Sequence, residues 1–239
     1  MSKFYRRTFI LLCSVSFLLG LFCQYVSVYY HYDVSSLDSY NSIEIEKNEY
    51  DGVLTYGSAD SNLGLIFYPG AKVEYTAYEP LMKQLASKGI FCVLIEMPYN
   101  IPIFGISSAY GIQDLYPNVD KWYMMGHSLG GAMAGTYLVD NYRDYEGLIL
   151  LASYVSDSLI HTDLNVISIY GSEDKILNMN NYEKSKKNYP DSFEEMIIYG
   201  GNHSYFGVYG LQNGDGKATI TNEQQIQQTV DVIKFFIID

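Results

Sequence analysis

Short apolar runs separated by polar, turn-rich segments dominate the chain after residue 50. Continuous hydrophobic stretches of this length are typical of strands that are buried on both faces of a parallel sheet. The pattern therefore predicts strands at residues 52–56, 63–68, 90–95, 121–125, 147–152, 165–170 and 195–198.

Helical spacing predicts helices between these strands. Residues 75–88 place apolar side chains at helical intervals, and Gly89 ends the helix. Shorter helices are expected at 109–115 and 181–188, and a capping-box pattern beginning at Thr221 opens the last helix. Strands that alternate with helices predict an α/β fold with a mostly parallel sheet.

The N-terminal part of the chain has a different pattern. Residues 9–28 form an apolar run about as long as a bilayer-spanning helix, and basic residues precede it. We expect residues 1–30 to be an uncleaved signal-anchor with a cytoplasmic N-terminus, so that the rest of the chain is extracytoplasmic and held in the cell membrane by a single pass. A cleaved signal peptide is the alternative, although no small-residue cleavage site fits well. Residues 31–50 are expected to be a linker, or an edge strand near 42–46, and 51–239 a single domain.

Charge and composition narrow the range of partners. The 239-residue chain carries a net charge of −12, and every acidic side chain follows residue 30. This balance argues against nucleic acid as a partner and against electrostatic docking on anionic lipid. The three cysteines show no pairing or metal-ligand spacing. The sequence has no metal or nucleotide motif, so we expect no cofactor and no metal, and the oligomeric state is left open.

One stretch carries the chemistry: Tyr123-Met124-Met125-Gly126-His127-Ser128-Leu129-Gly130-Gly131. It predicts a strand end, a tight turn with Ser128 at its apex, and the start of a helix. This is the G-x-S-x-G pattern of a nucleophile elbow, in which glycines on either side allow strand and helix to pass closely.

A serine nucleophile needs a base and an acid that orients the base. His203 follows the last predicted strand, at the edge where the serine would project, and we prefer it to His161 as the base. Asp174 follows the strand at 165–170 and is the preferred acid, with Glu173 as the alternative. The predicted catalytic residues are therefore Ser128, Asp174 and His203.

The tetrahedral intermediate also needs backbone donors for its oxyanion. Leu129, directly after the nucleophile, is one candidate. Ala71, in the turn after the strand at 63–68, is the other, with Lys72 and Gly70 as alternatives.

With these motifs in place, the sequence resembles the α/β-hydrolase family from about Gly52 onward, in particular small, cap-poor bacterial members near the dienelactone hydrolases. The resemblance implies an eight-stranded sheet with one antiparallel strand and hydrolysis of an ester through an acyl-enzyme. Two departures matter. Pro69 stands where many members have histidine, and Ser128 replaces the cysteine of true dienelactone hydrolases, so their substrate does not carry over.

The predicted function is that of a membrane-tethered serine hydrolase acting on a small-molecule ester or acyl substrate. We expect pocket walls from residues 97–110 and 205–209. The apolar character of Ile101, Ile103, Phe104 and Ile106 suggests an acyl or lipid-like group, and packing of this loop on the core is the alternative. A catalytically idle surface binding protein is one alternative. An acyltransferase or a peptidase that uses the same triad is another, because a triad does not choose the acceptor.

Overall fold

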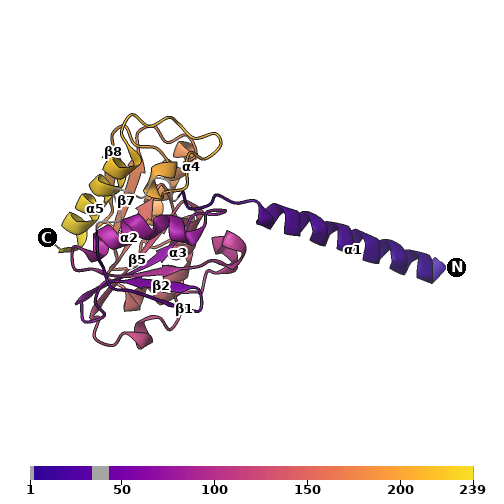
Figure 1. Cartoon of the computed structure of the whole chain (residues 1–239), viewed down its shortest axis with the longest axis horizontal. Helices are drawn as coiled ribbons and strands as arrows, with labels where there is room; N and C mark the ends of the chain where they lie inside the picture. The colour runs from indigo at the N-terminus through magenta and orange to yellow at the C-terminus, as the bar shows by residue number, and fades with distance from the viewer. Residues whose placement is uncertain (1–2, 34–42, 239) are drawn as a thin grey trace.

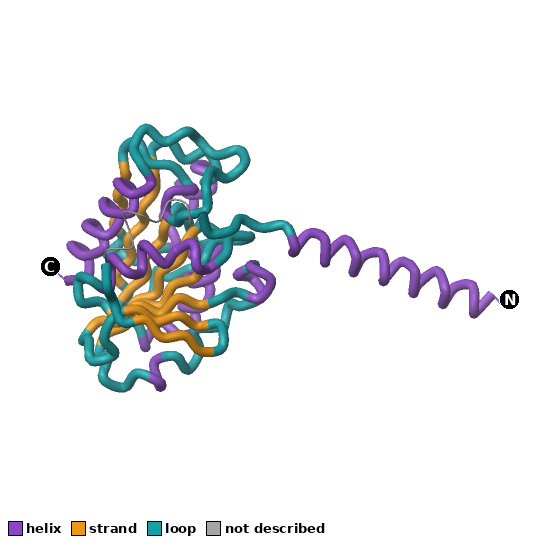
Figure 2. The backbone as a smooth tube through the Cα atoms, in the orientation of Figure 1, coloured by secondary structure: helices purple, strands orange, loops and turns teal. Residues whose placement is uncertain are grey.

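A sheet runs through the middle of the computed structural model, which describes residues 3–33 and 43–238 (Figure 2). Within these residues the sheet has eight strands in the order β1-β2-β4-β3-β5-β6-β7-β8. The strands are β1 (Lys47–Tyr50), β2 (Val53–Tyr56), β3 (Leu63–Tyr68), β4 (Phe91–Ile95), β5 (Lys121–His127), β6 (Gly147–Leu151), β7 (Asn165–Gly171) and β8 (Glu194–Ile198).

One strand of the sheet runs against its neighbours. β2 pairs antiparallel with both β1 and β4, and the pairs from β4 to β8 are all parallel. The predicted α/β class and the expected single antiparallel strand are both confirmed. Because the carboxyl ends of parallel strands meet at one edge, the segments that follow β3, β5, β7 and β8 come together there.

Helices cover both faces of the sheet (Figures 1 and 2). α2 (Glu79–Ala86) and α5 (Asn222–Ile238) pack on one face, where Leu81 and Val230 join the same buried cluster as Leu65 of β3. α3 (Leu129–Asn141) packs on the other face through Leu138 and contacts the cluster that contains Leu150. α4 (Met179–Ser185) lies against β7. The short 3₁₀ helices are η2 (Tyr75–Tyr78), η3 (Pro98–Asn100), η4 (Pro102–Phe104), η5 (Gln113–Leu115), η6 (Tyr142–Asp144), η7 (Lys186–Asn188) and η8 (Ser204–Phe206).

The first strand was the hardest to predict. β1 lies at Lys47–Tyr50, inside the range expected to be a linker and just after the edge strand expected near 42–46 as the alternative. Residues 34–42 of that range are outside the described residues. Its sequence, Lys-Asn-Glu-Tyr, is polar and largely exposed because β1 is an edge strand with only one neighbour. A strand of this kind lacks the apolar signal on which the other predictions depend.

Helix α1 (Lys3–Ser27) projects away from the domain, on the side opposite the C-terminus (Figure 1). The stretch Arg7–Ser27 is long and apolar enough to cross a membrane, and the rest of the protein does not bury its apolar residues. A signal sequence has the same length and composition. The described chain therefore has an N-terminal apolar helix suited to either role.

Because the central strands are buried, we expect shortening one of their core side chains to lower the free energy of unfolding substantially. Leu150 of β6 is fully buried between β5 and β7, so we expect Leu150→Ala to lower the free energy of unfolding by about 2–5 kcal/mol. The measurement is urea unfolding in mild detergent, followed by the fluorescence of Trp122. The exposed Leu115 supplies the matched control, whose alanine variant should stay within about 0.5 kcal/mol of the parent. Equal losses in both variants would contradict this placement of the core.

Candidate functional site

The turn between β5 and α3 holds Ser128 in a strained backbone conformation. Its φ is 52° and its ψ is −124°, in a region that residues with a side chain rarely adopt. A Cβ at Gly130 would collide with the carbonyl oxygens of Tyr68 and Pro69, and one at Gly126 would collide with the backbone of Gly130 and Gly131. The two glycines are therefore required for the close passage that the elbow pattern predicts.

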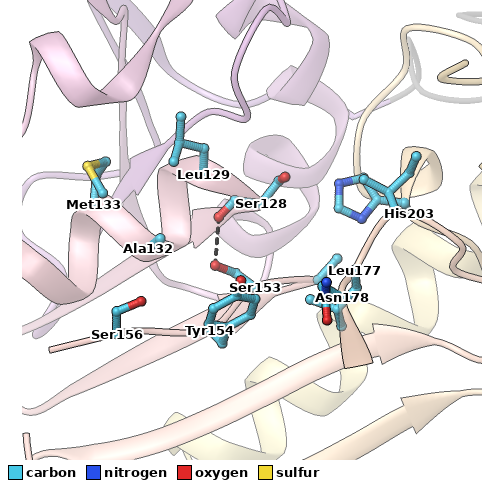
Figure 3. A pocket seen from close by; sticks show the side chains of 12 residues that line it. Ser128, Leu129, Ala132, Met133, Ser153, Tyr154, Ser156, Leu177, Asn178 and His203 are labelled. Atoms are coloured by element: carbon cyan, nitrogen blue, oxygen red, sulfur yellow. Dashed lines mark hydrogen bonds between the residues drawn. The ribbon is translucent and has the colours of Figure 1, made fainter. Parts of the chain in front are cut away.

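Neighbouring strands hold the elbow in place. The Ser128 N–H donates to the carbonyl of Leu151 in β6 at 2.9 Å. The Ser153 hydroxyl donates to the Ser128 carbonyl at 2.6 Å, which is the dashed line in Figure 3. Both backbone groups of Ser128 are thus engaged, and its hydroxyl is the polar group left to project into the pocket.

His203 and Asp174 form a buried pair at the same edge of the sheet. The Nδ1 atom of His203 lies 2.8 Å from Oδ2 of Asp174, and both side chains are almost completely buried. The other carboxylate oxygen, Oδ1, accepts the N–H groups of Ile176 and Leu177, each at 2.8 Å. Because a carboxylate only accepts, it places the proton on Nδ1 and leaves Nε2 of a neutral imidazole with a lone pair.

That second ring nitrogen faces the serine. Across the described parts of the chain, Nε2 of His203 is buried and has no hydrogen-bond partner. Figure 3 shows the Ser128 hydroxyl pointing toward the His203 ring across the pocket that both residues line. The structure therefore brings Ser128, His203 and Asp174 together at one rim, with the serine and the imidazole facing each other but not hydrogen-bonded.

The alternatives to these two residues lie elsewhere. His161 is exposed and is not among the residues that line the pocket. Glu173 accepts a hydrogen bond from the Ser172 hydroxyl at 3.0 Å, whereas Asp174 is the carboxylate that reaches His203. The geometry thus favours the preferred residue in each pair.

Two residues that sequence reasoning did not select organise the His203 loop. The Asp215 carboxylate accepts the N–H and the hydroxyl of Ser204 at 2.9 and 2.6 Å, and it lies 3.4 Å from the His203 N–H. The side-chain amide of Gln225 on α5 accepts the Asn202 N–H at 2.9 Å and donates to the Asn202 carbonyl at 2.8 Å. Asp215 stands in a Gly-Asp-Gly turn, which the sequence alone presents as an ordinary surface turn.

A chain of hydrogen bonds runs beneath the site through His127. Nε2 of His127 must donate to the His203 carbonyl, 3.0 Å away, because that oxygen only accepts. Nδ1 therefore carries a lone pair and accepts the hydroxyl proton of Tyr78 at 2.8 Å. The Tyr78 oxygen in turn accepts the Gly70 N–H at 3.1 Å. His127 thereby links the His203 loop to the turn after β3.

These hydrogen bonds decide which backbone N–H groups remain as candidate oxyanion donors. The Gly70 N–H is bound to Tyr78, and the Lys72 N–H donates to the Asn100 carbonyl at 2.6 Å, so neither is free for a ligand. The N–H groups of Ala71 and Leu129 have no acceptor among the described residues. Leu129 lines the pocket and Ala71 does not. The turn and the elbow are in contact, since Gly130 packs on the Pro69 carbonyl.

The pocket around these groups has a volume of about 370 Å³, within the usual range for small-molecule sites. The segments 97–110 and 205–209, which we expected to form its walls, contribute none of the lining residues. The walls come instead from the start of α3 and from the segments after β6 and β7, because those segments flank the elbow directly. The lining residues are Ser128, Leu129, Ala132, Met133, Ala152, Ser153, Tyr154, Ser156, Ile176, Leu177, Asn178 and His203 (Figure 3). In the described part of the chain, no group of three or more His, Cys, Asp or Glu side chains could hold a metal ion.

Comparison with known proteins adds a family and a set of similar folds. A model of the alpha/beta hydrolase family matches residues 64–227. A search of curated proteins finds no match.

Three solved structures show the similarity of fold. The dienelactone hydrolase of Anabaena variabilis is 10% identical with a TM-score of 0.61, and the alignment covers 78% of this chain and 96% of that one. The monoacylglycerol lipase of Paleococcus ferrophilus is 10% identical with a TM-score of 0.59, covering 81% and 99%. A structure from work on carboxylesterases of Nitrososphaera gargenis is 13% identical with a TM-score of 0.57, covering 81% and 97%. At these identities the likeness concerns the fold alone.

The buried position of His127 predicts a dependence of stability on pH. Burial lowers the pKa of His127 well below 6.5, and the nearby His203 lowers it further. The unfolded chain therefore binds a proton below pH 6.5 that the folded chain does not, so stability falls as the pH drops. Between pH 6.5 and 5.5 this site alone should remove about 1 kcal/mol from the free energy of unfolding.

Urea unfolding at these two pH values tests the effect. We expect His127→Asn to be less stable than the parent at pH 6.5 but to lose less stability on acidification. The exposed His161 provides the control, and His161→Asn should keep the pH dependence of the parent. A parental pH dependence in His127→Asn would show that His127 is not the group responsible.

Proposed function

We propose, from the premise that this chain belongs to the alpha/beta hydrolase family, that it is a serine hydrolase that cleaves carboxylic esters or related acyl bonds. The single observation that carries the proposal is the pairing of His203 with Asp174, which leaves the other imidazole nitrogen without a partner and facing Ser128. Lipase and carboxylesterase activities are named among the proteins of similar fold, which supports the substrate class.

In the proposed reaction the Ser128 oxygen bonds to the carbonyl carbon of the ester while its proton moves to Nε2 of His203. Asp174 stabilises the imidazolium that forms, and it holds the ring in the reactive tautomer. The N–H groups of Leu129 and Ala71 donate to the negative oxygen of the tetrahedral intermediate. When the intermediate collapses, the bond to the leaving oxygen breaks, and the alcohol departs with the proton from His203.

The second half of the cycle restores the enzyme. A water molecule attacks the acyl-enzyme and gives one proton to Nε2 of His203, and the carboxylic acid leaves as Ser128 recovers its proton. The pocket is open to solvent on one side, with no cap segment between β6 and β7, so water reaches the acyl group directly.

We further propose that α1 is a membrane anchor and that the domain lies outside the cytoplasm. The length of the apolar stretch, about 21 residues, supports this because it matches a bilayer core of about 30 Å. Lys3 and Arg6 precede it and Arg7 is its first residue, and a basic flank favours the cytoplasmic side.

Labelling with a fluorophosphonate probe tests the serine chemistry. We expect the parent protein to be labelled and Ser128→Ala to lose the label completely, because the alcohol that forms the covalent bond is gone. Asp174→Asn and His203→Ala should label at least about a hundredfold more slowly, since the base is missing or holds the wrong tautomer.

Ser153 provides the matched control for this experiment. Its hydroxyl also lies in the pocket but donates to the Ser128 carbonyl, so Ser153→Ala should still label. A folded parent protein that takes no label would contradict the hydrolase proposal and favour a binding role for the site.

Cell fractionation tests the anchor. We expect the full-length protein in the membrane fraction after an alkaline wash, with an intact mass that includes residues 1–30. A mature N-terminus near residue 30 would instead identify α1 as a cleaved signal sequence. Leu18 lies near the middle of the helix, so Leu18→Arg should weaken membrane retention, because a central charge costs about 2.5–3.5 kcal/mol.

A further inference from the structure

The segment 97–110 is apolar, carries no charged residue, and is not used by the pocket. Tyr110, at its end, is 79% exposed, and three other large side chains, Tyr99, Ile103 and Phe104, are 59%, 52% and 52% exposed. We call these three residues the apolar patch. The loop that carries them is held in place, since the Asn100 carbonyl accepts the Lys72 N–H at 2.6 Å.

The apolar patch touches the end of the N-terminal helix. The Phe22 ring lies 5.6 Å from the Tyr99 ring and 6.1 Å from the Phe104 ring, both in edge-on contact. Tyr99 and Phe104 are themselves 5.9 Å apart. The ammonium group of Lys72 lies 4.1 Å from the centre of the Tyr25 ring. Helix and patch thus form one continuous apolar and aromatic surface.

These contacts fix the depth of the patch relative to a bilayer. Phe22 precedes the last helical residue, Ser27, by five residues, or about 7–8 Å along the helix axis. With Arg7–Ser27 across the hydrocarbon layer, Phe22 lies inside its boundary, and the side chains that contact Phe22 reach the interface. Tyrosine and other aromatic residues are favoured at that level.

Tyr30, in the segment after the helix, is hydrogen-bonded to loops at the edge of the sheet that carries the candidate site. Tyr30 donates its N–H to the Lys72 carbonyl at 2.7 Å and accepts the Glu74 N–H at 2.9 Å, beside Ala71. Its hydroxyl accepts the Asn213 N–H at 2.9 Å, in the turn that contains Asp215. The anchor is therefore joined to the turn after β3 and to the loop after β8, both at the carboxyl edge of the sheet.

We propose that the apolar patch is a membrane-docking surface that inserts into the bilayer interface beside α1, so that the edge bearing Ser128 faces the membrane and takes acyl esters that reside in it. The choice of substrate rests on the proposed hydrolase activity, and the docking rests on the proposed anchor. The occupant is a lipid surface because the patch is continuous with the helix that enters it. Insertion of uncharged aromatic side chains also suits a domain of negative charge, which anionic lipid would not attract.

Quenching by brominated lipid tests the docking. The full-length Phe104→Trp variant is reconstituted into vesicles of phosphatidylcholine, with or without bromine on the acyl chains near the headgroup. We expect bromine to reduce the emission of the introduced tryptophan at least twofold, with the signal of the native, buried Trp122 subtracted from the parent protein.

Phe235→Trp is the matched control. Phe235 is 70% exposed and belongs to the last turn of α5. The C-terminal end of α5 is on the side of the domain away from α1 (Figure 1). The emission of this variant should change by less than a fifth. Equal quenching at the two positions, or no quenching at position 104, would overturn the docking. Protection of position 104 that depends on protein density rather than on bromine would assign the patch to a second copy of the chain and would also overturn it.

A kinetic comparison tests the substrate class. We expect the double variant Ile103→Asp/Phe104→Asp to hydrolyse a long-chain p-nitrophenyl ester embedded in vesicles at least tenfold more slowly than the parent. Its rate on water-soluble p-nitrophenyl acetate should change less than twofold, because neither residue lines the pocket. Equal losses on both esters would overturn the proposed substrate class. If the parent cleaves neither ester, the hydrolase proposal fails, whereas the quenching result still decides the docking.

Discussion

The hydrogen bond between Nδ1 of His203 and Asp174 is the interaction on which the candidate site depends. It is buried, so it is little screened by water, and the two backbone donors on the other carboxylate oxygen keep Asp174 in place. It fixes which imidazole nitrogen holds the proton and where the free lone pair points. Without it, Ser128 would be a strained but unactivated alcohol, since a hydroxyl is a poor nucleophile near neutral pH.

The supports of this pair come from three segments: the loop after β8, helix α5 and the end of β5. Asp215 and Gln225 hold the backbone on either side of His203, while His127 holds its carbonyl from below. Because His127 also connects through Tyr78 to Gly70, the candidate base and the turn of the candidate oxyanion donor share one buried network. A buried polar network is costly when it is only partly hydrogen-bonded. The neutral His127 is accommodated at its buried position because both of its ring nitrogens have partners.

The sequence predicted the parts of the fold that have a strong local signal. Buried parallel strands have a recognisable sequence pattern, a continuous apolar run. The elbow glycines lie at a fixed spacing along the sequence from Ser128. Both features could therefore be predicted. β1 could not, since an exposed edge strand has no apolar pattern. Asp215 and Tyr78 were missed for another reason: each acts through a partner far away in the chain, and no local pattern encodes such a contact. The exposure of Tyr99, Ile103 and Phe104 was missed because apolar composition alone does not distinguish a pocket wall from an exposed surface. Other residues of segment 97–110, such as Met97 and Ala109, pack into the core.

The position of α1 on the domain follows from how Tyr30, just after the end of the helix, is held. Tyr30 bridges the turn after β3 and the loop after β8, so a helix that ends at Ser27 has little freedom to leave the domain anywhere else. A long unattached linker would allow the site to face any direction. Hydrogen bonds this close to the helix end instead tie the orientation of the edge that carries the candidate site to the orientation of α1. With α1 as the proposed membrane anchor, the edge that carries Ser128 and the side of the domain that faces the membrane are the same side.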